Sequence, residues 1–210
     1  MLPSPPIGIP DRLAGDARRL RRRQQQAIEA LQRRGFEEVA VPMLERADVF
    51  CTAESVRFVD REGDLLGLRA DFTGPLARVV ATRLSGVPDL RLCYRGTLFR
   101  DGARRELQQA GFEHFGDGSV EEDIQAILTA VEVARALGYE ARVSLSMAEA
   151  DPQRLATILD ALEGKIPVQV DLAEQAFSYY TGIVFSLYAE GVPRRLGGGG
   201  RYDGLVGRFG

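Results

Sequence analysis

The chain has 210 residues, enough for one large domain or two small ones whose cores need no disulfide or metal ion for support. Hydrophobic residues make up 45% and charged residues 27% of the chain, which is typical of a soluble globular protein. No apolar run approaches the roughly 20 residues of a membrane-spanning helix, and the proline-rich N-terminus lacks the basic start and apolar centre of a signal peptide. We therefore expect a cytoplasmic protein with no membrane partner.

The net charge of −3 weighs against a nucleic-acid partner, because proteins that bind nucleic acids usually present a basic surface to the phosphates. Arginines between residues 18 and 23 form one positive run, which a solvated helix face explains without a bound polyanion. Cys51 and Cys93 are isolated and lack the Cys-x-x-Cys spacing of zinc sites. We expect both to be reduced thiols.

Hydrophobic periodicity divides the first half of the chain into helices and strands. Apolar residues repeat at helical spacing between residues 11 and 34, and Gly35 is a suitable C-terminal cap. Pro42 ends the strand that follows this helix, and Pro75 lies in the first turn of the next helix. The expected elements are, in order, a helix over 11–34, strands over 36–41 and 65–69, a helix over 73–84, and strands over 90–100 and 105–115.

The second half begins with a helix-start signal at Ser119, because Ser119-Val-Glu-Glu122 matches a capping box. Gly138 ends this helix. The elements expected after it are a strand over 141–147, a helix from residue 152, strands over 166–170 and 176–188, a glycine loop over 197–200, and a turn over 203–208. Antiparallel strands flanked by helices indicate an α+β fold.

Several segments resemble histidyl-tRNA synthetases, a branch of the class II aminoacyl-tRNA synthetases. Each segment alone is a weak signal, but together they occur in the order found in that family. The matching segments are residues 11–42 (motif 1), 68–73 (amino-group loop), 92–116 (motif 2), and 179–182 with 197–205 (amino-acid pocket). The resemblance implies a class II synthetase-like antiparallel sheet flanked by helices, formed as a single domain over 1–210. It also implies a homodimer, built on the first helix and the strand that ends at Pro42.

Polar residues in these segments could bind a free amino acid, which presents an ammonium, a carboxylate and a side chain. Asp71 and Thr73 could accept hydrogen bonds from the ammonium group. Arg100 could bind the carboxylate, with Gln109 beside it. Glu113 lies four residues after Gln109 on the expected strand, so that both side chains project from the same face. The carboxylate of Glu113 suits an imidazole N–H.

Aromatic residues would complete this pocket, since Tyr179, Tyr180 and Tyr202 could supply its walls and hydroxyl groups. By resemblance, these polar and aromatic positions match the residues that contact histidine in the synthetases. A polar sheet face with surface tyrosines is the alternative interpretation of the same pattern. The resemblance implies histidine as the ligand.

Two other features suggest chemistry at first sight but are better explained without it. Gly197–Gly200 has no Gly-Lys-Ser/Thr motif beside it, so a permissive loop that passes close to a ligand explains it better than phosphate binding. His114 is the only histidine, and no acid, cysteine or second histidine stands near it at ligand spacing. We expect no metal ion and no catalytic triad, with His114 packed under the pocket.

The chain departs from the synthetases where those enzymes handle ATP and tRNA. Only residues 101–105 separate the two expected strands of motif 2, whereas the synthetase loop is longer and reaches over ATP. Gln175 stands where the synthetases carry an arginine that assists adenylate formation, and a neutral amide cannot stabilise phosphate charge as a guanidinium does. The sequence ends at Gly210, before a counterpart of motif 3 or of an anticodon-binding domain. We expect no catalytic residues and no cofactor.

These departures are typical of a synthetase-like binding subunit, and the chain resembles the regulatory subunits of ATP phosphoribosyltransferase in histidine biosynthesis. The resemblance implies a non-catalytic protein that binds the short-form catalytic subunit, supports its activity and takes part in its inhibition by histidine. The alternative is a minimal class II enzyme that makes an aminoacyl adenylate for a carrier other than tRNA. A third hypothesis, an RNA-binding remnant that uses the arginines of residues 18–23, is disfavoured by the pI of about 5.4.

Overall fold

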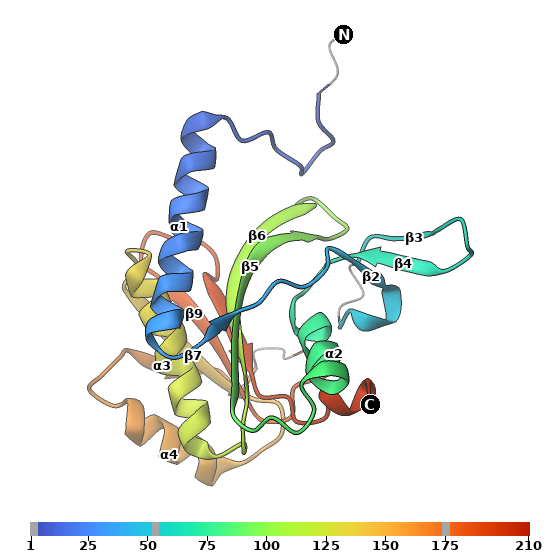
Figure 1. Ribbon diagram of the computed structural model, residues 1–210. Helices are drawn as coiled ribbons and strands as arrows, with labels where there is room; N and C mark the ends of the chain where they lie inside the picture. Colours follow the sequence, from blue (N-terminus) through green and yellow to red (C-terminus); the bar gives the residue numbers. More distant parts are fainter. Residues whose placement is uncertain (1–3, 52–54, 174–176) are drawn as a thin grey trace. The chain divides into compact units, whose positions relative to one another are not determined.

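The computed structural model describes residues 4–51, 55–173 and 177–210 (Figure 1). The chain divides into two compact units. The first unit comprises residues 1–86, 91–113 and 206–210, and the second comprises residues 87–90 and 114–205. No helix among the described residues has both the length and the apolar character needed to cross a membrane.

The first unit contains two helices, several short strands and one pair of long strands. Its elements are α1 (Ala14–Arg33), β1 (Glu37–Glu38), β2 (Leu44–Arg46), the 3-10 turn η1 (Ala47–Val49), β3 (Arg57–Val59), β4 (Leu65–Leu68), α2 (Thr73–Arg83), most of β5 (Leu90–Phe99), most of β6 (Glu106–Phe115) and the 3-10 turn η2 (Val206–Arg208).

Helix α1 buries only the C-terminal half of its apolar stripe. Ala27 and Ile28 are almost fully buried, whereas Leu13, at the N-terminal end of the helix, is 77% exposed. The arginines between residues 18 and 23 are exposed, as expected for a solvated face. Gly35 has a φ of 83°, which confirms the predicted C-terminal cap.

Two small sheets organise the first unit, with strand orders β1-β5-β6 and β2-β4-β3. The strand expected over 36–41 is shorter than predicted, although Val39 N–H still donates to Cys93 O (2.9 Å) beyond the end of β1. Strands β5 and β6 are long and lie side by side (Figure 1). The predicted tight turn joins them, and Arg100 N–H donates to Arg105 O (3.0 Å).

Arg69 fixes the segment between β4 and α2, which carries the candidate pocket residue Asp71 and leads into Thr73. Its buried guanidinium donates from Nη1 to Val41 O (2.9 Å) and from Nη2 to Thr97 O (2.9 Å). The same group lies over the ring of Phe72, 4.2 Å from its centroid. Burial lowers the pKa of Arg69 from its ordinary value, and the carbonyl partners compensate for the lost hydration.

The second unit is a four-stranded sheet packed against two helices. Its elements are α3 (Val120–Ala136), β7 (Ala141–Met147), α4 (Pro152–Leu162), β8 (Val168–Val170), β9 (Ile183–Ala189) and β10 (Gly197–Gly200). The strand order is β10-β9-β7-β8, antiparallel except between β7 and β8. Helices α3 and α4 and strands β7 and β9 share one core, whose fully buried members include Ile127, Val131, Val143, Leu145, Ile158 and Leu162.

Ser119 caps α3 as predicted, because its Oγ accepts a hydrogen bond from Glu122 N–H (3.4 Å). The second hydrogen bond of a capping box, from the Ser119 N–H to the Glu122 carboxylate, is replaced by bonds to neighbouring residues. The Glu122 carboxylate accepts from the N–H groups of Asp117 and Gly118 (3.2 and 2.8 Å), while Ser119 N–H donates to the Asp117 carboxylate (2.9 Å). The start of α3 is therefore fixed by three neighbouring side chains.

The prediction of a glycine loop over 197–200 is wrong, because these residues form the edge strand β10. They pair with β9 from Gly197 opposite Leu187 to Gly200 opposite Val184. A Cβ atom at Gly198 would lie 2.5 Å from a backbone oxygen of β9, so a side chain there would collide with the neighbouring strand. The glycines serve close strand pairing.

The strand expected over 176–188 begins only at Ile183, since residues 177–181 form turns and residue 176 lies outside the described part of the chain. Sequence periodicity also missed β2, η1 and β3, which are only three residues long each. The other helices and strands lie close to their expected bounds, and the α+β class is confirmed.

Candidate functional site

Glu113 is the centre of a hydrogen-bonded group in the first unit. This residue on β6 is only 8% exposed, and its Oε1 accepts a hydrogen bond from Thr73 Oγ1 (2.8 Å) at the start of α2. The hydroxyl of Tyr94, on β5, lies 3.3 Å from the same oxygen. The structure thus brings two predicted pocket residues, Thr73 and Glu113, into direct contact.

Tyr94 belongs to this group although the sequence did not single it out. Its ring stacks on Phe72 at a centroid distance of 4.2 Å. A Cβ at Gly111 would lie 2.6 Å from the Tyr94 hydroxyl, so the absence of a side chain there lets the tyrosine reach Glu113. The glycine two residues before Glu113 on the same strand face was the available sequence signal.

Asp71 and Arg100 are anchored to the backbone around the start of α2. The Asp71 carboxylate accepts from Gly74 N–H (2.9 Å) in the first turn of α2 and from Cys51 N–H (3.0 Å). Negative charge is favourable at this end of a helix. Arg100 donates from Nε to Ala70 O (3.0 Å), one residue before Asp71. Both side chains therefore order the 70–74 segment as well as carrying charge.

Gln109 provides an unsatisfied polar atom in the first unit. Its Oε1 is buried and has no hydrogen-bond partner among the described residues. Leaving such an atom unpaired costs about 1–3 kcal/mol, so a buried orphan acceptor needs an explanation. Gln109 shares a strand face with Glu113, and a ligand N–H would satisfy it.

Burial and nearby negative charge both raise the pKa of the Cys51 thiol. Burial raises it to about 12, and the charges of Asp71 and Glu113 act in the same direction while Arg208 opposes them. Two carboxylates close to one partly buried thiol favour a cationic or N–H-donating ligand there. The charge suits an ammonium or an imidazole.

The predicted aromatic residues form a cluster in the second unit. Tyr179 lies 4.8 Å from Tyr180 and 6.2 Å from Tyr202, measured between ring centroids. Phe177 stacks on Tyr179 at 5.4 Å, and Phe115 contacts Tyr202 edge-on at 6.4 Å. The two tyrosine segments, far apart in the sequence, therefore meet as expected.

Backbone and side-chain bonds join these segments. Thr181 N–H donates to Arg201 O (2.8 Å), and Thr181 Oγ1 donates to Asp203 Oδ2 (2.8 Å). Arg201 Nε donates to Asp203 (2.9 Å), and this bond holds the pKa of Asp203 below its usual value and raises that of Arg201. The tyrosines on either side of these residues are thereby held in register.

An open polar pocket of about 540 Å³ lies beside this junction, within the second unit. Its lining includes Met147, Arg154, Thr181, Gly182, Arg201 and Asp203. Both arginines donate to Gly118 O, and Arg154 also pairs with Asp123 (2.6 Å). Burial raises the pKa of Asp123, an effect that the pairing with Arg154 opposes.

The predicted pocket residues thus fall into two groups. The first unit contains Asp71, Thr73, Arg100, Gln109 and Glu113, and the second contains Tyr179, Tyr180 and Tyr202. Gln175 lies outside the described residues, so the structure provides no view of it. The short turn between β5 and β6 is as predicted, with residues 101–105 all exposed.

His114 does not lack acidic neighbours in space, which corrects the expectation from its sequence context. Its Nε2 lies 2.5 Å from Asp89 Oδ1 and 3.5 Å from Glu122 Oε1. Asp89 is 25 residues away in the chain, a separation that local ligand spacing cannot detect.

Comparisons with known proteins identify the family. A family model described as Histidyl-tRNA synthetase matches residues 8–152 and 141–210. A protein of Moorella thermoacetica named ATP phosphoribosyltransferase regulatory subunit is 30% identical, over 98% of this chain and 76% of that protein. The chain belongs to the histidyl-tRNA synthetase family, in its branch of ATP phosphoribosyltransferase regulatory subunits. A protein of the same name from Alkaliphilus metalliredigens is 39% identical over 63% of this chain and 37% of its own length.

A solved structure confirms the class II synthetase-like fold. It is a Bacillus halodurans protein described as an ATP phosphoribosyltransferase regulatory subunit/histidyl-tRNA synthetase, with a TM-score of 0.87. The match covers 98% of this chain and 78% of that chain at 22% identity, so it supports the fold alone.

The Moorella relative contains an internal segment that has no counterpart here. Its alignment runs over 298 positions, although this chain has only 210 residues. The two pieces of the family match overlap between residues 141 and 152, which places the junction at β7 and the start of α4. Residues of this junction line one side of the open pocket.

Proposed function

We propose that this protein is a non-catalytic subunit that binds the short-form catalytic subunit of ATP phosphoribosyltransferase, supports its activity and mediates inhibition by histidine. The similarity along 98% of the chain to a protein named as that regulatory subunit carries the proposal. The pocket residues and the short turn between β5 and β6 supply the physical reasons.

Histidine is the proposed ligand of the first-unit group. Glu113 would accept from the imidazole N–H, and Arg100 would bind the carboxylate. Gln109 Oε1, buried without a partner, would accept from the ammonium or imidazole group. That Tyr179, Tyr180 and Tyr202 supply aromatic walls for the ligand stays a prediction from the sequence.

The lack of an ATP-activating function follows from the β5–β6 turn. Adenylate formation requires fixed positive charge over the triphosphate, because phosphate charge develops during the reaction. Here the turn contains only residues 101–105, all of which are exposed. A turn of this length is too short to extend over a bound nucleotide.

A homodimer would cover apolar surface of the first unit around the predicted interface. Half or more of the side-chain surface of Leu13, Met43 and Leu65 is exposed, and Val59 is opposite Leu65 in the sheet. Scattered exposed apolar residues are common, but several in and beside the small β2-β4-β3 sheet favour association. A stable interface would bury at least about 1,000 Å² in total.

Sedimentation of the chain with the catalytic subunit of the same organism tests the assembly. We expect the two proteins to form a complex at micromolar concentrations. Histidine should change the affinity of the two subunits for each other, and complex formation should change the affinity of the chain for histidine by the same factor. Typical coupling of about 1–3 kcal/mol corresponds to roughly 5–150-fold. Pyrophosphate exchange into ATP, measured in parallel with each amino acid, should stay at the no-protein level. Absence of a complex together with histidine-dependent exchange would replace this proposal with an amino-acid-activating enzyme.

A further inference from the structure

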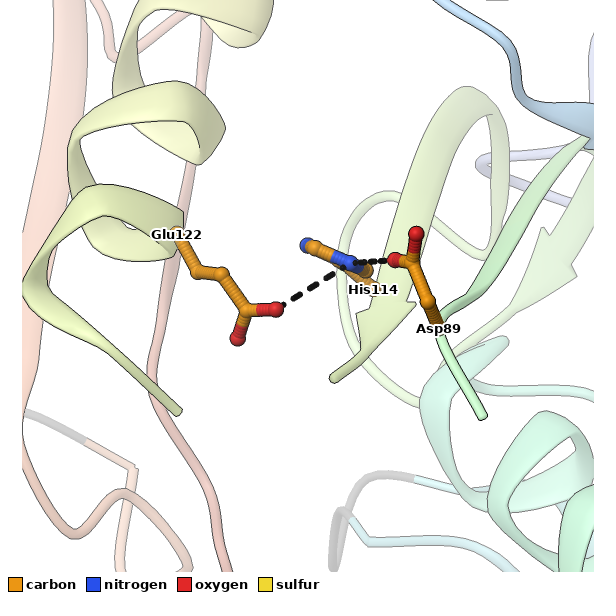
Figure 2. Close-up of side chains that lie close together, drawn as sticks. All are labelled: Asp89, His114 and Glu122. Atoms are coloured by element: carbon orange, nitrogen blue, oxygen red, sulfur yellow. Dashed lines mark hydrogen bonds and ion pairs between the residues drawn. The ribbon is translucent and has the colours of Figure 1, made fainter. Parts of the chain in front are cut away.

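Three potential metal ligands meet in the second unit, outside the residues proposed to bind histidine (Figure 2). Asp89 lies just before β5, His114 near the end of β6, and Glu122 in the first turn of α3. One ligand atom from each lies within 4.8 Å of the others. Within residues 4–51, 55–173 and 177–210, no other group of three such side chains is this close.

The cluster is ordered on one side and open to water on the other. The side chain of His114 is 12% exposed and that of Glu122 is 24% exposed, whereas that of Asp89 is 57% exposed. Glu122 is held by the N–H groups of Asp117 and Gly118. A bound ion would therefore have two fixed ligands, one adjustable ligand and access to water.

Without a metal ion, the His114 Nε2 atom is the shared neighbour of the Asp89 and Glu122 carboxylates. His114 Nε2 carries at most one proton, so it can donate a full hydrogen bond to Asp89 at 2.5 Å but not also to Glu122 at 3.5 Å. A metal ion that replaces this proton and lies between the three groups could contact all of them. The two carboxylates give the cluster a net negative charge in either protonation state of the imidazole, which favours a cation.

We propose that Asp89, His114 and Glu122 form a binding site for a divalent first-row metal ion of the Zn²⁺ type. One imidazole nitrogen, two carboxylate oxygens and one water would complete a tetrahedral site. Metal–ligand distances of about 2.1 Å place tetrahedral ligands roughly 3.4 Å apart. The His114–Glu122 distance of 3.5 Å already meets this requirement. Asp89, the most exposed of the three, would have to move, because its Oδ1 lies only 2.5 Å from His114 Nε2.

Such an ion would join three segments of the second unit. These segments are the residue before β5, the end of β6 and the first turn of α3. Because the site forms only in the folded chain, bound metal stabilises the fold in proportion to the logarithm of free metal over Kd. The position of the 87–90 segment would then depend on metal occupancy.

Isothermal titration of the full metal-free chain with Zn²⁺ tests the site, with thermal unfolding followed at each metal concentration. We expect one saturable ion per chain and an unfolding midpoint that rises with free Zn²⁺. Asp89→Asn and His114→Gln should each weaken binding at least tenfold and abolish the thermal shift. Glu121→Gln is the matched control, because Glu121 occupies the same helix turn but is exposed and outside the cluster.

Co²⁺ provides an independent readout that separates this site from the two cysteines. Nitrogen and oxygen ligation gives visible d–d absorption without the intense thiolate charge-transfer band that Cys51 or Cys93 would produce. We expect the d–d signal in the parent chain and in Glu121→Gln, and its loss in His114→Gln. Circular dichroism of each variant checks that it folds. No saturable binding at submillimolar Zn²⁺, or equal binding by folded His114→Gln, would overturn the proposal.

Discussion

Replacing Glu113 with glutamine is the sharpest perturbation of the proposed histidine pocket. The side chain is buried, and its Oε1 receives both the Thr73 hydroxyl (2.8 Å) and the Tyr94 hydroxyl (3.3 Å). Glutamine keeps the shape and one acceptor oxygen, so both hydroxyl contacts can persist. The substitution removes the charge that would bind the imidazole N–H, with little expected effect on folding.

The magnitude follows from the loss of one charge-assisted hydrogen bond in a desolvated position. Hydrogen bonds to charged groups contribute about 1.5–3 kcal/mol, and each 1.4 kcal/mol is tenfold in affinity. We therefore expect Glu113→Gln to weaken histidine binding by roughly tenfold to a hundredfold. The raised pKa of Cys51 should fall in the same variant, because the Glu113 charge contributes to it.

Calorimetric titration of histidine into the parent chain, Glu113→Gln and Glu37→Gln measures this effect. Glu37 lies on β1 and is exposed, so its substitution removes the same charge away from the pocket and should leave histidine affinity unchanged. Equal affinity for all three proteins would refute the assignment of Glu113 to the ligand. A large loss of stability in Glu113→Gln would instead make its role structural.

Three further predictions concern the ion pair, the thiols and the dimer. Asp203→Asn should lower the unfolding midpoint at pH 7 by up to about 3 °C, as for an exposed ion pair. Because the folded state lowers the pKa of Asp203, the contribution of this residue to folding stability is complete above pH ~4 and disappears as the pH falls further. An equal difference in unfolding midpoint between the parent chain and Asp203→Asn at pH 3 and pH 7 would contradict this. Burial raises the pKa values of Cys51 and Cys93 to about 12 and 11, so both thiols should react slowly with thiol reagents at pH 8 until the chain is denatured. Rapid labelling of the native chain would contradict this prediction. In sedimentation experiments Met43→Glu should dissociate the dimer, whereas Leu172→Glu, at an even more exposed residue of the second unit, should not. An unaffected Met43→Glu dimer would move the interface elsewhere.

Sequence periodicity predicted the elements whose signals are local. Helix α3 has a capping serine at its start and a glycine after its end, and β5 and β6 have long patterns with an obvious turn between them. Strands β2 and β3 have three residues each, too few for an alternating pattern to stand out. The glycines of β10 have low intrinsic strand preference, and only pairing with β9 makes them a strand.

The candidate site was predictable where one strand or one motif carries its residues. The spacing of Gln109 and Glu113 puts both on one face of β6 without knowledge of the tertiary fold. Tyr94 on β5 can contact Glu113 on β6 because Gly111 has no side chain in the way. This contact depends on the register of the two strands. The cluster around His114 depends on contacts between separate elements, so its acidic members could not be found by local spacing.

Activity of the catalytic subunit tests the central claim most directly. ATP phosphoribosyltransferase activity of that subunit, purified from the same organism, should be measured against increasing amounts of this chain, each with and without histidine. We predict that activity rises to saturation as the chain is added, that histidine inhibits the saturated complex, and that the complex made with Glu113→Gln needs at least tenfold more histidine for the same inhibition. Activity that stays constant over the whole titration, with both proteins folded, would contradict the account.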